Sequence, residues 1–202
     1  MQDLRAVLFD LDGVLIDSNE AWFQLVNAAA LHFRKPEIAR ERFQAGWGQG
    51  IDTDLRDFFP GCSRQEIEAF YGEHLLDFGG SIVLEPGARE TLMQLRDAGK
   101  LRGVVTNTPT SLARDLLAWT GLIGQVDVTV GAGDDMPPKP SPAVILRACQ
   151  ILEVRPEQAL VVGDSRFDEQ AARAGNVPFV GLRSQSARSV SSLGEVVALA
   201  VS

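Results

Sequence analysis

Hydrophobic and polar residues along the chain predict strands that alternate with helices, apart from one long helical stretch near the N-terminus. Short apolar runs are typical of the buried strands of a parallel sheet, and apolar residues three and four positions apart are typical of helices. Five short runs occur, at residues 6–9, 101–105, 126–130, 159–162 and 177–180. Because helical patterns separate them, we expect a three-layer α/β fold with a five-stranded parallel sheet and right-handed crossovers.

The stretch between the first two strands, residues 17–82, has helical patterns and no strand pattern. Ser63 and Glu66 form a capping-box sequence that predicts the start of its last helix, and the glycines at 79 and 80 predict the end of that helix. We therefore expect an α/β core of residues 1–16 and 83–202, with an inserted all-helical domain of residues 17–82.

Further helices are expected in the second part of the chain, between and after the strands. Their apolar spacing places them around residues 92–98, 112–119, 142–152 and 167–174, and a last helix begins at about Leu193 after a serine-rich loop.

Composition limits the classes of function that fit this fold. The chain has 202 residues, 45% of them hydrophobic, which allows one good core or a core with a small accessory domain. A net charge of -8 disfavours a nucleic-acid partner. No apolar run has membrane-spanning length and the N-terminus resembles no signal peptide, so we expect a cytoplasmic protein without a membrane partner. Cys62 and Cys149 have no metal-like spacing and are expected to be free thiols. Without a heptad pattern, we expect a monomer or a weak homodimer.

Two carboxylates and a glycine follow the first strand directly, as Asp10, Asp12 and Gly13. Burying a carboxylate is costly without a cation or hydrogen bonds, and two close carboxylates repel unless a metal ion holds both ionised. One hypothesis is an acidic metal and phosphate site. The alternative is an ordinary Asp-Gly turn with solvated acids.

Polar residues also follow the other strands. Thr106 and Asn107 follow the second strand, Lys139 comes in the loop after the third, and Asp164 and Asp168 follow the fourth. Taken singly, these residues fit a turn, a solvated lysine, a helix cap and a first-turn acid. In an open α/β sheet, however, ligands bind beyond the carboxyl ends of the strands. Together these groups suit a phosphoryl group with Mg²⁺.

Four motifs resemble those of the haloacid dehalogenase superfamily of phosphatases. The stretch from Asp10 to Ser18 (D-L-D-G-V-L-I-D-S) resembles the first motif. Thr106, Lys139 and the G-D-S-x-x-D sequence at 163–168 resemble the other three. The resemblance covers residues 4–16 and 83–182 and implies a Rossmann-like core.

The helical insert is similar to the α-helical cap of the phosphoglycolate phosphatase and β-phosphoglucomutase branch. The dipeptide at 17–18 and the tripeptide at 85–87 resemble the cap junctions of that branch.

The resemblance implies a role for each motif residue. Asp10 would be the nucleophile that forms an aspartyl-phosphate, and Asp12 would be the general acid and base. Mg²⁺ would be held by Asp10, Asp12 and Asp164, with Asp12 contributing its backbone carbonyl. The phosphoryl group would be bound by Thr106, Asn107 and Lys139. Asp168 would orient Lys139 or a metal-bound water.

These roles predict a Mg²⁺-dependent phosphatase for a small phosphorylated metabolite, such as a sugar phosphate or a phosphoglycolate-like compound. Asp12 disfavours the dehalogenase branch, because a carbon–halogen bond needs no protonated leaving group. Two alternatives stay open: a phosphomutase of the β-phosphoglucomutase kind, and a non-enzyme, receiver-like domain that accepts phosphate.

Substrate choice is expected to depend on the cap. The glycine-rich loop at 45–50, with Trp47, either faces the site or is a plain turn with a buried tryptophan. Basic residues of the cap could meet a second anionic group of the substrate. These candidates are Arg34, Lys35, Arg40, Arg42, Arg56 and Arg64.

Overall fold

A parallel sheet of six strands forms the centre of the computed structural model, which describes residues 4–133 and 136–201. The strand order is β5-β4-β1-β6-β7-β8. The strands are β1 (Ala6–Phe9), β4 (Leu101–Thr106), β5 (Val128–Gly131), β6 (Ala159–Gly163), β7 (Phe179–Leu182) and β8 (Ser189–Val190). Phe9, the last residue of β1, pairs with Val104 on one side and Val162 on the other. The residues that follow β1 therefore emerge at the middle of the sheet edge.

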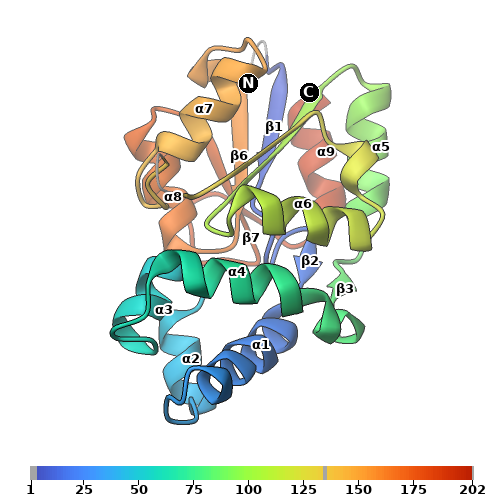
Figure 1. Cartoon of the computed structure of the whole chain (residues 1–202). Helices are drawn as coiled ribbons and strands as arrows, with labels where there is room; N and C mark the ends of the chain where they lie inside the picture. The colour runs from blue at the N-terminus through green and yellow to red at the C-terminus, as the bar shows by residue number, and fades with distance from the viewer. Residues whose placement is uncertain (1–3, 134–135, 202) are drawn as a thin grey trace.

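Helices cover both faces of the sheet. One face carries α5 (Ala88–Asp97), α6 (Thr110–Trp119) and α9 (Leu193–Val201), and the other carries α7 (Ala143–Ile151) and α8 (Arg166–Ala174). Alternate side chains of β1 point to opposite faces of the sheet. Val7 and Phe9 belong to one apolar cluster, and Ala6 and Leu8 belong to the other. In Figure 1, α5 and α9 lie on one side of the sheet and α7 and α8 on the other. The predicted three-layer, Rossmann-like α/β fold is confirmed.

A helical segment, residues 18–82, lies beyond the carboxyl end of β1 (Figure 1). The chain enters and leaves it through an antiparallel ribbon, in which β2 (Ile16–Asp17) pairs with β3 (Val83–Leu84). The segment contains α1 (Asn19–His32), α2 (Arg40–Gly46), α3 (Ile51–Asp57), α4 (Arg64–His74) and a 3-10 helix (Leu75–Ser81). The ribbon places the segment over the strand ends.

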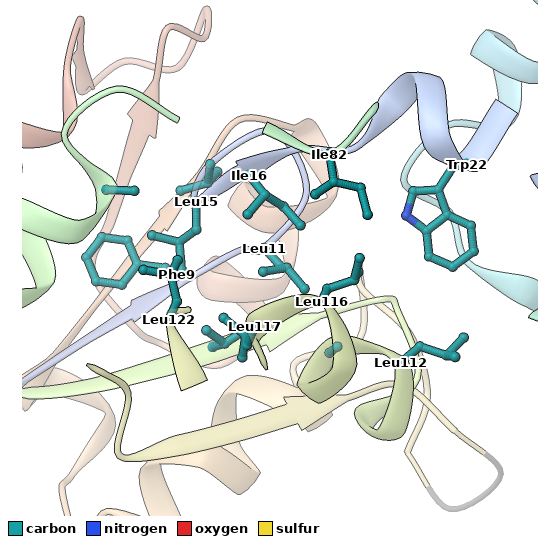
Figure 2. Close-up of a cluster of buried hydrophobic side chains, with 14 of the residues drawn as sticks. Phe9, Leu11, Leu15, Ile16, Trp22, Ile82, Leu112, Leu116, Leu117 and Leu122 are labelled. Carbon is teal, nitrogen blue, oxygen red and sulfur yellow. The ribbon is translucent and has the colours of Figure 1, made fainter. Parts of the chain in front are cut away.

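The apolar core is continuous from the sheet into this helical segment. Figure 2 shows Leu11 beside Leu116 of α6 and Phe9 beside Leu122, with Trp22 of α1 at the border of the group. The same cluster extends to side chains of α4. The helical segment is thus packed against the sheet by buried apolar surface, which stabilises its position over the strand ends.

Two details of the sequence prediction need correction. The sheet has six strands rather than five, because the two residues of β8 lie in the serine-rich loop and are too few to give an alternating pattern. The α-helical part of the last insert helix ends at His74, and its predicted end near Gly79 lies in the 3-10 helix. The predicted capping box is confirmed, since the Ser63 side chain accepts a hydrogen bond from the backbone N–H of Glu66.

The other strands of the main sheet and its helices follow the expected order, whereas the β2–β3 ribbon was not predicted. Cys62 and Cys149 are free thiols. Within residues 4–133 and 136–201, every helix is too short or too polar to cross a lipid bilayer.

Candidate active site

The strand ends bring the predicted acidic residues and the lysine together. Asp10 follows β1, Asp164 follows β6, and Asp168 lies in the first turn of α8. One carboxylate oxygen of each lies within 4.8 Å of the others. Lys139, from the loop after β5, joins two of these carboxylates. The topology therefore produces the cluster that the sequence pattern predicts.

Lys139 is buried rather than solvated, with 3% of its surface exposed. Its ammonium group contacts Oδ1 of Asp10 at 2.9 Å, Oδ1 of Asp168 at 2.6 Å and the carbonyl oxygen of Val105 at 3.1 Å. Three acceptors match the three N–H groups of an ammonium ion. Burial lowers the pKa of Lys139, but the attraction of Asp10 and Asp168 outweighs it and raises the pKa above its ordinary value. Lys139 is a fixed positive charge.

Asp10 and Asp164 occupy an environment that disfavours negative charge. Burial, followed by repulsion from Asp168, raises the pKa of Asp10 well above its usual range, although Lys139 opposes the shift. Burial and the same repulsion raise the pKa of Asp164 to about 6. A bound cation would favour the ionised form of both carboxylates.

Gly13 allows the chain to pass close to Asp164. It has a φ of 84°, in the left-handed region, and a Cβ atom there would overlap Oδ2 of Asp164. Only glycine allows both this backbone conformation and the close approach of the Asp164 carboxylate.

The Asp12 carboxylate belongs to a separate hydrogen-bond network. Its Oδ1 accepts hydrogen bonds from the hydroxyl group of Ser18 and from Nε1 of Trp22, the latter at 3.2 Å. Its Oδ2 accepts a hydrogen bond from Oγ1 of Thr108 at 2.9 Å. Its carboxylate is not part of the cluster of Asp10, Asp164 and Asp168.

Sequence reasoning missed these three partners of Asp12. Ser18 and Thr108 stand in stretches that the motifs cover, so position alone could have suggested them. Trp22 carried no such signal, because it looks like one of the apolar residues of α1.

Asn107 links three parts of the site through its side-chain amide. Its Nδ2 donates to the carbonyl oxygens of Gly48 at 2.8 Å and Lys139 at 3.2 Å, and its Oδ1 accepts from the backbone N–H of Lys139 at 2.6 Å. The amide therefore fixes the lysine loop and the loop between α2 and α3. Thr106 lines the pocket beside it, and its Oγ1 accepts from the backbone N–H of Thr108 at 3.1 Å.

Asp168 is completely buried and holds Lys139 in place. Its Oδ1 accepts from Lys139, while its Oδ2 accepts from the hydroxyl group of Ser165 at 2.5 Å and from the Ser165 backbone N–H at 3.1 Å. Both oxygens of Asp168 are thus engaged by protein groups.

A pocket of about 100 Å³ separates the strand ends from the helical segment. Its strand-side lining includes Asp10, Asp12, Thr106, Asn107 and Asp164. Its helical lining includes Trp22, Phe43, Trp47, Gly48, Ile51 and Asp54. Of the two interpretations of the Trp47 loop, this placement favours the one in which the loop faces the site.

The basic residues of the helical segment do not line this pocket. Arg40 pairs with Glu20, Arg56 with Asp57 and Arg64 with Asp52 and Glu68. Lys35 and Arg42 donate to the backbone carbonyls of residues 60 and 57. The pocket lining gives no support to the expectation that they meet a second anionic group of a ligand, which stays a prediction.

The donor set fits a hard divalent cation. Asp10 and Asp164 offer carboxylate oxygens at one place, and Mg²⁺ prefers oxygen ligands. Asp168 is nearby, but its hydrogen bonds to Lys139 and Ser165 occupy it.

Comparison with known proteins gives the family. Residues 7–182 match the haloacid dehalogenase-like hydrolases. The chain belongs to this family. The predicted family and the prediction of a hydrolase are both confirmed.

Relatives of known name and structure agree with this assignment. A phosphoglycolate phosphatase of Pseudomonas putida is 34% identical over 188 residues, which cover 88% of this chain and 69% of that protein. The structure of a haloacid dehalogenase-superfamily hydrolase, subfamily IA, from Geobacter sulfurreducens is similar with a TM-score of 0.75 and 26% identity, covering 97% of this chain and 99% of that one. CbbY from Rhodobacter sphaeroides, solved in complex with phosphate, shares the fold with a TM-score of 0.83 and 23% identity, covering 96% of each chain.

Proposed function

We propose that this hydrolase cleaves a small phosphate monoester through an aspartyl-phosphate on Asp10, with Mg²⁺ bound beside it. The observation that carries the proposal is the buried Lys139, whose ammonium group lies 2.9 Å from Asp10, a residue that lines the pocket. A carboxylate next to a fixed positive charge suits attack on an anionic phosphoryl group. The similarity to a phosphatase of P. putida supports the same reaction class.

The first step is attack by the Asp10 carboxylate on phosphorus. An oxygen–phosphorus bond forms, the ester oxygen–phosphorus bond breaks, and Asp12 gives a proton to the departing alkoxide. In the second step a water molecule attacks the phosphorus of the aspartyl-phosphate and gives a proton to Asp12, while the bond between the Asp10 oxygen and phosphorus breaks. Inorganic phosphate leaves and Asp10 is regenerated.

The hydrogen bonds of Asp12 suit this acid–base role. Ser18, Trp22 and Thr108 hold its carboxylate in one orientation on the pocket wall. A fixed proton donor needs no reorientation when the leaving group departs.

The charges around the phosphoryl group come from both chain and cation. We propose that Asp10 and Asp164, with the backbone carbonyl of Asp12, hold Mg²⁺. When bound, the cation supplies positive charge that screens the carboxylates from the phosphate and polarises its oxygens. Thr106 would bind a phosphoryl oxygen, and Asp168 would position Lys139. The predicted phosphate contact of Asn107 stays a prediction, because its side-chain amide already bonds to Gly48 and Lys139.

The helical segment would act as the cap of the site, as part of an inserted domain of residues 17–82. It supplies one wall of the pocket, and a pocket of about 100 Å³ suits a small leaving group. The amide of Asn107 ties its loop at Gly48 to the strand ends. The same closure would decide how much water reaches the aspartyl-phosphate, which separates a phosphatase from a phosphomutase.

Hydrolysis of p-nitrophenyl phosphate tests the proposal. We expect phosphate release by the purified protein with Mg²⁺ and none with EDTA. Asp10→Asn should lower the rate by at least about a thousandfold, as expected when a catalytic nucleophile is removed. Asp97→Asn, at the exposed end of α5, is the matched control and should keep full activity.

Intact mass after incubation with the substrate distinguishes the alternatives. A protein that gains one phosphoryl group without turnover would point to a phosphomutase or to a receiver-like domain that accepts phosphate. Full activity of Asp10→Asn would refute the proposed nucleophile.

A further inference from the structure

The helical wall of the pocket carries a single charged side chain among the described residues, Asp54 of α3. The rest of this wall consists of apolar side chains and glycines, among them Trp22, Phe43, Trp47 and Ile51. Neither lysine nor arginine lines the pocket within residues 4–133 and 136–201. The leaving group of a substrate would therefore meet one carboxyl group in apolar surroundings.

The position of Asp54 is fixed by aromatic side chains that also reach the reacting end of the pocket. The hydroxyl group of Tyr71, a fully buried residue of α4, donates to Oδ2 of Asp54 at 2.9 Å. The Tyr71 ring packs edge-on against Trp22, with 5.6 Å between the ring centroids. Trp22 in turn donates to Asp12. Asp54 thus has a defined place relative to the proposed general acid.

The negative charge of Asp54 is poorly compensated by the protein. Burial raises its pKa to about 7, although the hydrogen bond from Tyr71 lowers it, and Asp57 adds repulsion. In the part of the chain that the structure describes, Tyr71 is the recorded side-chain partner of this carboxylate, and it is neutral. A ligand that brings a hydrogen-bond donor or a positive charge would stabilise Asp54, and a ligand that brings an anion would be repelled.

We propose that Asp54 is a specificity-determining residue that favours phosphate monoesters whose leaving group carries a hydroxyl or ammonium group and disfavours those with a second anion. The inference rests on the proposed phosphatase function and narrows its substrate class. It predicts that this chain disfavours phosphoglycolate, the compound in the name of its P. putida relative, because phosphoglycolate carries a carboxylate.

Four phosphate esters whose leaving groups share a two-carbon skeleton and differ in its second substituent test this inference. They are ethyl phosphate, 2-hydroxyethyl phosphate, 2-aminoethyl phosphate and phosphoglycolate. The measured quantity is kcat/KM with Mg²⁺ at about pH 8.5, where a carboxyl group with a pKa of about 7 is ionised. We expect the hydroxyl and ammonium esters to exceed phosphoglycolate by at least about tenfold, which corresponds to about 1.4 kcal/mol.

Asp54→Asn should reduce this preference by about tenfold, raising kcat/KM for phosphoglycolate and lowering it for 2-aminoethyl phosphate. Ethyl phosphate, which offers neither a donor nor an anion, should change by less than about twofold. Asp52→Asn is the matched control, because Asp52 lies on the same helix, is exposed and pairs with Arg64 at 2.7 Å. It should leave all four values unchanged.

Two results would overturn the inference: wild-type protein that prefers phosphoglycolate, or an Asp54→Asn variant that alters all four esters by the same factor. If Asp54→Asn does not fold, the wild-type preference alone decides. Failure of the proposed function looks different, since then neither ethyl phosphate nor any other ester is hydrolysed, and both proposals fall together.

Discussion

Lys139 is the residue on which the charge balance of the site depends. Its ammonium group lies 2.9 Å from Asp10 and 2.6 Å from Asp168. Replacing Lys139 with methionine would leave these two carboxylates buried near each other without a cation. Removing one partner of a buried ion pair costs about 3–5 kcal/mol. We expect Lys139→Met to lose this much free energy of unfolding, measured by urea denaturation in EDTA.

Lys35→Met is the matched control for that experiment. The Lys35 ammonium group donates to the carbonyl oxygen of Pro60 at the surface of the helical segment. Its replacement should change the free energy of unfolding by less than about 0.5 kcal/mol. A loss of the same size in both variants would show that Lys139 is not held as a buried ion pair.

Single residues differ in how well the sequence could predict them. Asp10, Lys139 and Asp164 could be placed because each follows a strand, and parallel strands bring their ends together. Asp54 could not, because an aspartate on α3 looks like part of a solvated helix face. Only the packing of α4 brings Tyr71 onto it.

A hydrogen bond joins Asp54 of α3 to Tyr71 of α4, which should make the packing of these helices sensitive to pH. Burial raises the pKa of Asp54 to about 7, whereas an unfolded aspartate has a pKa of about 4. The folded state therefore binds this proton more tightly, and its contribution to stability is present at low pH and lost as the pH rises from about 4 to about 7.

Asp54→Asn removes this titration. Relative to wild type, the free energy of unfolding of the variant should rise by about 2–4 kcal/mol between about pH 4 and about pH 8. Urea denaturation across this range measures the difference, and Asp52→Asn should instead run parallel to wild type. A constant difference between Asp54→Asn and wild type would mean that Asp54 titrates normally in the folded protein.

Among the secondary-structure elements, those with a sequence pattern of four or more residues were predicted, and the two-residue strands were not. The apolar runs of β1, β4 and β6 and the capping box of α4 each contain enough residues to be recognised. The strands β2, β3 and β8 have two residues each, and their pairing depends on partners that are distant in sequence or in a loop. A local pattern carries no information about such a partner.

In the whole molecule, the candidate active site lies where the helical segment meets the carboxyl ends of the strands. The apolar cluster that includes Phe9 continues into the helical segment, so the pocket exists only when the segment is packed over the strand ends. Sequence patterns predicted both parts, but not the side chains at their contact, because these depend on the relative orientation of the two. A cytoplasmic location and a monomer or weak homodimer stay predictions.

Binding of Mg²⁺ should stabilise the whole fold, because the proposed ligands come from loops that follow β1 and β6. Unfolding separates these loops, so the cation binds the folded state better. At about a hundred times its dissociation constant it adds about 2.7 kcal/mol, which raises the Tm of a chain of this size by about 5–10 °C. Thermal unfolding with MgCl₂, against NaCl of equal ionic strength, measures the shift. Asp164→Asn should lose most of the shift and Asp97→Asn should keep it. An equal shift in both variants would place the cation elsewhere, whereas loss in Asp164→Asn alone ties the cation to the strand ends that form the pocket.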